Sequence, residues 1–264
     1  MNNINYWKER FDSLLEENRA IIKRSTFNRF VSGSINRLII SLSIFGLPRL
    51  LLKFFLWLHR LSYTMASFLA SKVYGIHPKH FVGYYHKFFI ENINKNSTIL
   101  DVGCGTGELT IELAGITSAD VIGIDNNQKN IEIAKACLSS QRNIQFMVGN
   151  ATNLNLYGMR FDRIILSNVL EHINDSTTLL NSLLNLISDQ GKLLIRVPRL
   201  DADWTVLTKK ELGMFYRSSV DHYQEYTAQA LAQELDNNGW DVVRIDEREE
   251  LFGIFKPKKK GLGE

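Results

Sequence analysis

The stretch Ile99-Leu-Asp-Val-Gly-Cys-Gly-Thr-Gly-Glu-Leu109 determines how the rest of this 264-residue chain is interpreted. Its first four residues are typical of a buried strand, and the residues after the glycines are typical of a helix start. Glycine at positions 103, 105 and 107 permits a tight turn and the close approach of a ligand to the backbone. Glycines that serve packing alone would give the same pattern. By itself this stretch predicts a strand–turn–helix unit and leaves ligand binding open.

Two carboxylates near this turn indicate which ligand it would hold. Asp125 ends the next predicted strand, about 20 residues after the glycines, where a carboxylate can accept hydrogen bonds from ribose hydroxyls. Asp101 lies two residues before the first glycine, and its charge would repel a nucleotide phosphate but attract the ammonium group of S-adenosylmethionine (SAM). The charges therefore favour SAM over a nicotinamide dinucleotide.

The segments after the next two predicted strands complete the pattern. Gly149-Asn150-Ala151-Thr152 offers a side-chain carbonyl to an adenine amino group, and Ser167-Asn-Val-Leu-Glu-His172-Ile follows the fourth strand. With Asp-Val-Gly-Cys-Gly-Thr-Gly and Ile-Asp, these segments resemble the class I SAM-dependent methyltransferases over roughly residues 97–255. That family usually has Asp where this chain has Asn150, although an amide keeps an acceptor oxygen. The resemblance implies SAM as cofactor and a site formed by Asp101, Gly103, Cys104, Gly105, Gly107, Asp125, Asn126, Asn150, Ala151, Thr152 and Ser167.

Alternating apolar runs and helical segments from residue 97 onwards predict an α/β fold with a doubly wound, mostly parallel seven-stranded sheet. The expected strands are Thr98–Val102, Val121–Asp125, Ile144–Val148, Arg163–Leu166, Lys192–Val197, Asp241–Glu247 and Leu251–Phe255. The expected helices are Gly107–Ala114, Gln128–Ser139, Ser176–Ile187 and Ala228–Asn238. Because only Arg248–Glu250 joins the last two strands, they should form an antiparallel hairpin. The sequence thus predicts a Rossmann-like methyltransferase domain over 94–256 and a flexible basic tail over 257–264.

Residues 1–93 are expected to form a helical extension with a strong positive charge. We expect helices over Tyr6–Lys23, Ile35–Val73 (broken at Gly46–Pro48) and Lys79–Asn92. Residues 18–90 contain eleven Lys or Arg and no Asp or Glu, so the net charge of +3 leaves −8 for the remainder of the chain. This asymmetry favours an anionic partner.

The apolar run from Leu38 to Leu58 is long enough to raise the question of a membrane span. Arg49 and Lys53 near its centre would each cost about 2.5–3.5 kcal/mol on insertion, which argues against spanning. Residues 35–73 could instead lie on an anionic membrane surface, cap the catalytic domain or form a homodimer interface. Nucleic-acid binding is not expected, because the aromatic residues follow the apolar face rather than alternating with the charges.

The two cysteines, Cys104 and Cys137, give no disulfide framework, and the first twenty residues do not resemble a secretory signal. We therefore expect a cytoplasmic protein, with a peripheral position at the inner face of the membrane as a further option. The sequence predicts no metal site.

Two histidines are candidate catalytic bases for a hydroxyl acceptor. His172 follows the fourth strand, and His222 lies in the polar and aromatic segment Asp221-His222-Tyr-Gln-Glu225-Tyr-Thr227. Each could take a proton near neutral pH. Each also has a structural alternative: His172 could pack or cap the following helix, and His222 could support a loop.

Several short segments resemble bacterial methyltransferases of surface-polysaccharide biosynthesis. They include His77-Pro-Lys-His80, Arg196-Val-Pro-Arg199, and Asp221-His222 with Glu225-Tyr226-Thr227. This narrower resemblance implies a glycan acceptor bound by Tyr85, His86, Arg196, Arg199, Trp204, Tyr223 and Tyr226. The alternative for residues 196–211 is a solvated charged loop.

The expected function is methyl transfer from SAM to a hydroxyl of a glycan or lipid-linked saccharide. Three alternatives stay open at this point: a small-molecule or quinone-type acceptor, a SAM-binding scaffold without catalysis, and a nicotinamide-dependent dehydrogenase. Asp101 argues against the dehydrogenase, because a dinucleotide site places a pyrophosphate at the glycine turn and the charge of Asp101 would repel it.

Overall fold

The computed structural model describes residues 47–74, 85–138, 143–154, 156 and 158–259. The chain divides into two compact units. One contains the helix α3 and Glu211–Met214, and the other contains the rest of the chain from His86 onwards. The expected helix over Tyr6–Lys23 and the first part of the expected helix over Ile35–Val73 lie outside the described residues.

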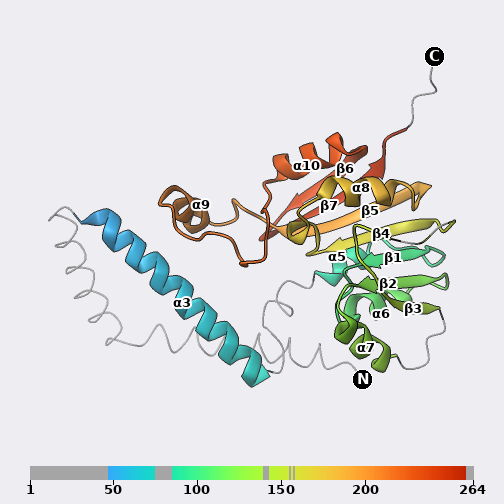
Figure 1. Cartoon of the computed structure of the whole chain (residues 1–264), viewed down its shortest axis with the longest axis horizontal. Helices are drawn as coiled ribbons and strands as arrows, with labels where there is room; N and C mark the ends of the chain where they lie inside the picture. The colour runs from blue at the N-terminus through green and yellow to red at the C-terminus, as the bar shows by residue number, and fades with distance from the viewer. Residues whose placement is uncertain (1–46, 75–84, 139–142, 155, 157, 260–264) are drawn as a thin grey trace, which may run out of the picture. The chain divides into compact units, whose positions relative to one another are not determined.

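A seven-stranded sheet forms the centre of the larger unit, in the order β3-β2-β1-β4-β5-β7-β6 (Figure 1). Its strands are β1 (Ile99–Val102), β2 (Val121–Asp125), β3 (Ile144–Val148), β4 (Phe161–Ser167), β5 (Ile187–Pro198), β6 (Trp240–Glu247) and β7 (Glu250–Pro257). The first five strands run parallel, and β7 pairs antiparallel with both β5 and β6. This confirms the predicted mostly parallel sheet with a terminal antiparallel hairpin.

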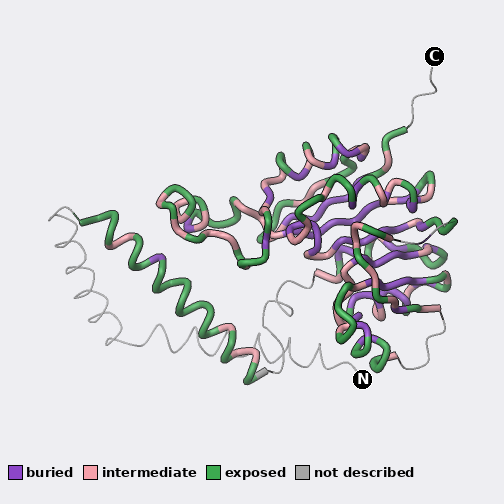
Figure 2. The backbone as a smooth tube through the Cα atoms, in the orientation of Figure 1, coloured by how far each residue is buried: buried purple, intermediate pink, exposed green. Residues whose placement is uncertain are grey.

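The central strands consist mainly of apolar residues because they are buried. All four residues of β1 are buried, as are most of those of β4 and β5, which Figure 2 shows as continuous purple along the sheet. Parallel strands covered on both faces need apolar side chains in both directions. Because β1 pairs in parallel with both β2 and β4, the carboxyl ends of these three strands lie side by side. Ligands of such sheets bind at that edge.

The helices of this unit are α5 (His86–Ile90), α6 (Glu108–Ala114), α7 (Gln128–Ala136), η1 (Leu170–His172), α8 (Ser176–Leu184), α9 (Trp204–Glu211) and α10 (Ala228–Asn237). Three of them begin at side-chain caps, in which Asn127, Asp175 and Thr227 each accept a hydrogen bond from a backbone amide of the first turn. The cap at Thr227 leaves the preceding residues, including His222, in a connecting segment.

Three differences from the sequence-based expectations have local causes. The helix expected to reach Ile187 ends at Leu184, because residues 185–186 form a turn and the buried Ile187 begins β5. Residues 204–211, for which a loop was one alternative, form α9, whose first turn is held by Asp203 accepting from the backbone amide of Thr205. Of the helix expected over Lys79–Asn92, the described part is α5.

The helix α3 (Pro48–Tyr74) begins at the predicted break, with proline in the first turn, where its missing amide hydrogen is not needed. It carries four Lys or Arg residues and no Asp or Glu. Its exposed large apolar side chains are Leu50, Phe54, Phe55, Trp57, Leu58, Leu61, Tyr63, Met65, Phe68, Leu69 and Val73. Within the described part of the chain, no helix is both long and apolar enough to cross a membrane.

Candidate functional site

The glycine turn after β1 is held against the end of β2. The backbone amides of Gly103 and Cys104 both donate to the carbonyl of Ile124, at 2.7 and 2.9 Å. Gly103 adopts φ +74°, and a Cβ atom there would meet a methyl carbon of Val169 at 2.4 Å. The segment that follows β4 therefore packs directly on the turn.

Gly105 differs from Gly103 in what lies around it. It adopts φ +54°, and a Cβ atom built there would meet nothing within 4 Å. The turn therefore presents bare backbone to open space at this position, which is the arrangement that a closely bound ligand needs. The observation supports the expected cofactor site.

Asp125, at the end of β2, fastens the turn from the other side. Its Oδ2 accepts from the backbone amide of Gly105 at 2.9 Å, and its Oδ1 accepts from the backbone amide of Asn127 at 2.9 Å. Asn130 also donates to Oδ1, at 3.1 Å. A carboxylate has about four acceptor positions, so Asp125 keeps capacity for ribose hydroxyls.

Asp101 lies beneath the turn and is 1 % exposed. Its Oδ2 accepts from the hydroxyl of Thr110 at 2.6 Å. Burial raises the pKa of the Asp101 carboxyl to about 6; the hydrogen bond from Thr110 opposes this shift, and the charge of Asp125 adds to it. A cationic ligand group beside Asp101 would compensate its charge.

Replacing Asp101 with Asn is expected to stabilise the cofactor-free protein at neutral pH. The pKa of Asp101 rises from 3.8 to about 6 on folding, so the free energy of unfolding falls as pH rises through this interval. Above about pH 6 the ionised Asp101 lowers the free energy of unfolding by about 3 kcal/mol. Asn removes that charge, and its side-chain oxygen can still accept the hydrogen bond from Thr110. Thermal unfolding from about pH 4 to about pH 8 checks this. Parallel pH profiles of the wild type and Asp101→Asn would contradict it.

The remaining expected cofactor residues surround the same edge of the sheet. Asn150 Oδ1 accepts from both the amide and the hydroxyl of Thr152 at 3.0 Å, which shapes the turn that contains Ala151. Asn126 is exposed beside Asp125, and Ser167 ends β4. Burial, with the charges of Asp101 and Asp125, raises the pKa of the Cys104 thiol, which favours the protonated form.

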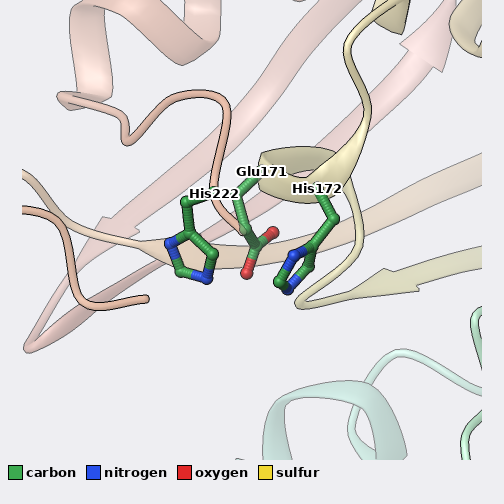
Figure 3. Close-up of side chains that lie close together, drawn as sticks. All are labelled: Glu171, His172 and His222. Carbon is green, nitrogen blue, oxygen red and sulfur yellow. The ribbon is translucent and has the colours of Figure 1, made fainter. Parts of the chain in front are cut away.

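Three side chains that the sequence places far apart meet after β4. The short helix η1 supplies Glu171 and His172, and the segment before α10 supplies His222. Each offers a ligand atom within 4.8 Å of the others, and Figure 3 shows the Glu171 carboxylate between the two imidazole rings. We call Glu171, His172 and His222 the acidic–histidine cluster.

Glu171 is fully buried, and neither of its carboxylate oxygens has a hydrogen-bond partner among the described residues. Burial raises the pKa of Glu171 to about 8, and its own backbone amide and the charge of Arg196 oppose that shift. A buried acid without a partner is unusual in folded proteins and indicates a functional position.

The two imidazole rings stack edge to face, with centroids 4.6 Å apart. His172 Nδ1 lies 3.1 Å from Asp221 Oδ2, and His222 Nδ1 lies 3.2 Å from Glu225 Oε1. Burial lowers the pKa of His222, and the hydrogen bond to Glu225 opposes this. Both histidines are therefore oriented by carboxylates.

Several of the residues expected to bind an acceptor have other partners in the structure. Arg196 is buried and forms a two-pronged salt bridge with Glu250, which ties β5 to β7. Arg199 pairs with Asp201 and Glu247, and His86 pairs with Glu112 at 2.5 Å. Tyr226 is buried in the core, where burial raises its pKa, whereas Trp204 and Tyr223 are exposed and Tyr85 belongs to the other unit.

Sequence reasoning gave no role to Glu171, Asp221 or Glu225. Glu171 stands beside His172 in the segment that carries the family resemblance, so its position was visible. Its burial was not, because the single turn of η1 is too short to show a periodic pattern.

The family model described as "Methyltransferase domain" matches residues 77–245, more than half of the chain. The chain is 34% identical over 110 residues to the ubiquinone biosynthesis O-methyltransferase of Bartonella tribocorum, covering 41% of this chain and 43% of that protein. It is 34% identical over 101 residues to the demethylmenaquinone methyltransferase of Lactococcus lactis, covering 37% and 40%. The chain thus aligns with less than half the length of these relatives.

Solved structures show the same fold at lower identity. Magnesium protoporphyrin IX methyltransferase from Synechocystis PCC 6803, solved with bound SAH, matches with a TM-score of 0.54 and 21% identity. The match covers 68% of this chain and 83% of that one. A SAM-dependent methyltransferase from Methanosarcina mazei matches with a TM-score of 0.52 and 20% identity, covering 64% and 97%.

Proposed function

We propose that this protein transfers the methyl group of SAM to a hydroxyl oxygen of a small quinone-type acceptor. The chain belongs to the methyltransferase domain family and uses SAM. The observation that carries the proposal is the packing of Val169 on Gly103. It connects the cofactor turn to the acidic–histidine cluster, which begins two residues later. An acceptor that meets the cluster is therefore close to the methyl donor.

SAM supplies a methyl group attached to a positively charged sulfur. The protein must orient the acceptor oxygen towards that methyl group and remove the hydroxyl proton. His222, oriented by Glu225, and His172, oriented by Asp221, are the groups that we propose meet the hydroxyl. A phenolic hydroxyl has a pKa near 10, as in tyrosine, whereas the pKa of an alcohol is much higher and close to that of water, so the phenol loses its proton far more easily.

Two acceptor classes followed from the sequence, and the second has the better support. The relatives from Bartonella tribocorum and Lactococcus lactis carry quinone names. Of the residues expected to bind a glycan, Arg196 and Arg199 form salt bridges and Tyr226 is buried. We therefore rank a quinone-type acceptor above a glycan or lipid-linked saccharide.

Labelled SAM tests the acceptor directly. The full chain is incubated with a hydroxylated benzoquinol, with demethylmenaquinol, and with lipid-linked saccharides from envelope extracts. We expect label in the quinol arm, and at least a 100-fold loss of that rate for His222→Ala. The exposed His59→Ala variant should keep the wild-type rate. Label in saccharides alone would overturn the proposal, and no label in any arm would favour a non-catalytic scaffold.

A second proposal concerns α3, whose basic residues and exposed apolar side chains are typical of a helix at a membrane surface. We propose that α3 brings the enzyme to anionic membranes, where lipophilic acceptors are dissolved. Each well-placed basic residue contributes about 1 kcal/mol on an anionic leaflet.

Vesicle sedimentation tests the proposal for α3. The full chain is expected to sediment with phosphatidylglycerol vesicles at low salt, less at high salt, and not with phosphatidylcholine alone. The paired substitution Arg49→Glu with Lys53→Glu should abolish sedimentation. If the protein forms a dimer in solution and does not sediment with vesicles, α3 would instead form a contact between two copies of the chain.

A further inference from the structure

The unpartnered carboxylate of Glu171 is the observation from which a further inference starts. An isolated buried charge is costly, and the usual compensation is a cation or a set of hydrogen-bond donors. Glu171 has 0 % exposure and no donor from another described residue on either oxygen. The nearby cation, Arg196, holds Glu250 through Nε at 2.5 Å and Nη2 at 3.0 Å.

The two histidines beside Glu171 are arranged as ligands of a metal commonly are. Asp221 lies at Nδ1 of His172 and Glu225 at Nδ1 of His222. When Nδ1 donates to a carboxylate, Nε2 keeps its lone pair and becomes a stronger ligand, which is the usual outer arrangement of metal-binding histidines. Glu225 is itself fixed, because the amide and hydroxyl of Ser218 donate to its Oε1.

The distances are compatible with a shared ion. One ligand atom from each of the three side chains lies within 4.8 Å of the others. Ligands bound to one divalent ion at about 2.0–2.2 Å lie roughly 3–4 Å apart, so small side-chain rotations close the site. Figure 3 shows the three groups converging from η1 and the segment before α10.

We propose that Glu171, His172 and His222 bind one divalent transition-metal ion, and that this ion takes the acceptor hydroxyl as a further ligand. Two imidazoles and one carboxylate favour Zn²⁺, Mn²⁺ or Fe²⁺ over Mg²⁺, which prefers oxygen ligands. Three protein ligands leave positions open for the acceptor. The second part of the proposal rests on the proposed function.

The ion would change how the hydroxyl proton is lost. A hydroxyl bound to a divalent ion ionises near neutral pH, as water does on Zn²⁺. Its O–H bond breaks and the proton passes to solvent. The oxygen then forms a bond to the methyl carbon as the carbon–sulfur bond breaks, and the sulfur keeps that electron pair. Under this proposal the histidines hold the ion and need not take the proton themselves.

Metal binding is measured first, without any acceptor. The full chain is stripped with a chelator and titrated with Mn²⁺, with the free ion followed by its paramagnetic resonance, and with Zn²⁺ in competition. We expect one ion per chain and at least a 10-fold weaker affinity for Glu171→Gln and for His222→Asn. Glu112→Gln is the matched control, because Glu112 also lies beside a histidine but outside the cluster, and it should bind as the wild type does.

The outcomes separate the site from the function. Unchanged binding by Glu171→Gln, or no binding by the wild type, would overturn the metal site. Calorimetry with SAM shows whether each variant is folded, since folded variants should keep the wild-type affinity for SAM. If the variants do not fold, Mn²⁺ added to the wild type must broaden the NMR signals of two of its six histidines for the site to stand. If the protein still methylates the quinol after a chelator has removed the bound metal, the proposed function stands and the role of the ion is overturned.

Discussion

Replacing Asp125 with Ala is expected to lower the affinity for SAM at least 100-fold. The carboxylate ends β2, faces the glycine turn and keeps about one acceptor position beyond its bonds to Gly105, Asn127 and Asn130. A hydrogen bond from a ribose hydroxyl to a charged acceptor contributes about 1.5–3 kcal/mol, and the upper part of that range accounts for the expected loss. Isothermal calorimetry with SAM measures it directly.

Asp125→Asn is the control for this result. It keeps one oxygen acceptor, so it should retain part of the affinity that Asp125→Ala loses. Both variants lose charge at the turn, and thermal unfolding shows whether each is folded at the temperature of the titration. Full SAM affinity in folded Asp125→Ala would mean that the ribose does not lie at β2.

Replacing Gly105 with Ala is expected to remove SAM binding while leaving the fold largely in place. The left-handed φ of +54° costs alanine about 1–2 kcal/mol, and the new methyl group meets no protein atom within 4 Å. It would instead project into the open space at the turn, where we expect the cofactor to lie. We expect at least a 10-fold weaker affinity by calorimetry.

Gly158→Ala is a matched control for this variant. Gly158 also has a left-handed φ, +80°, and open space where a Cβ atom would lie, but it is outside the site. It should show a similar loss of thermal stability and the wild-type affinity for SAM. If Gly105→Ala bound SAM as tightly as Gly158→Ala does, the cofactor would not approach the turn at Gly105.

The sheet was predictable because local chemistry and tertiary structure agree along it. The apolar runs that indicated β1, β2 and β3 coincide with the observed strands to within one residue. The short connection between β6 and β7 required a hairpin, and the structure has one. Strand ends were less predictable: β5 begins five residues before the expected Lys192, because Ile187 already pairs with Phe161 and the polar residues 188–190 lie in an irregular stretch before regular pairing begins at Lys192.

The cofactor side of the site was also visible in the sequence, because its residues follow consecutive strands of one parallel sheet. The acceptor side was not. Glu171 and His222 are about fifty residues apart, and only the packing of η1 against the segment before α10 brings them together. Similarly, the salt bridge of Arg196 with Glu250 depends on β5 and β7 being neighbours, which a charged segment read alone does not reveal.

Burial changes the meaning of residues whose identity was already known. His172 and His222 were candidates as single bases, whereas the structure places them on either side of a buried carboxylate. Asp101 was expected to attract a cation, and its raised pKa adds that this charge destabilises the folded protein when no cation is present. Both sides of the site therefore hold a buried acid whose pKa is raised by burial.

The location of the transferred methyl group tests the central claim most directly. SAM with a deuterated methyl group is reacted with a hydroxylated quinol by the full chain, and the product is analysed by mass spectrometry and NMR. We predict that the label is attached to the hydroxyl oxygen. A label on a ring carbon, or no transfer to any acceptor by a chain that binds SAM, would contradict methyl transfer at the acidic–histidine cluster.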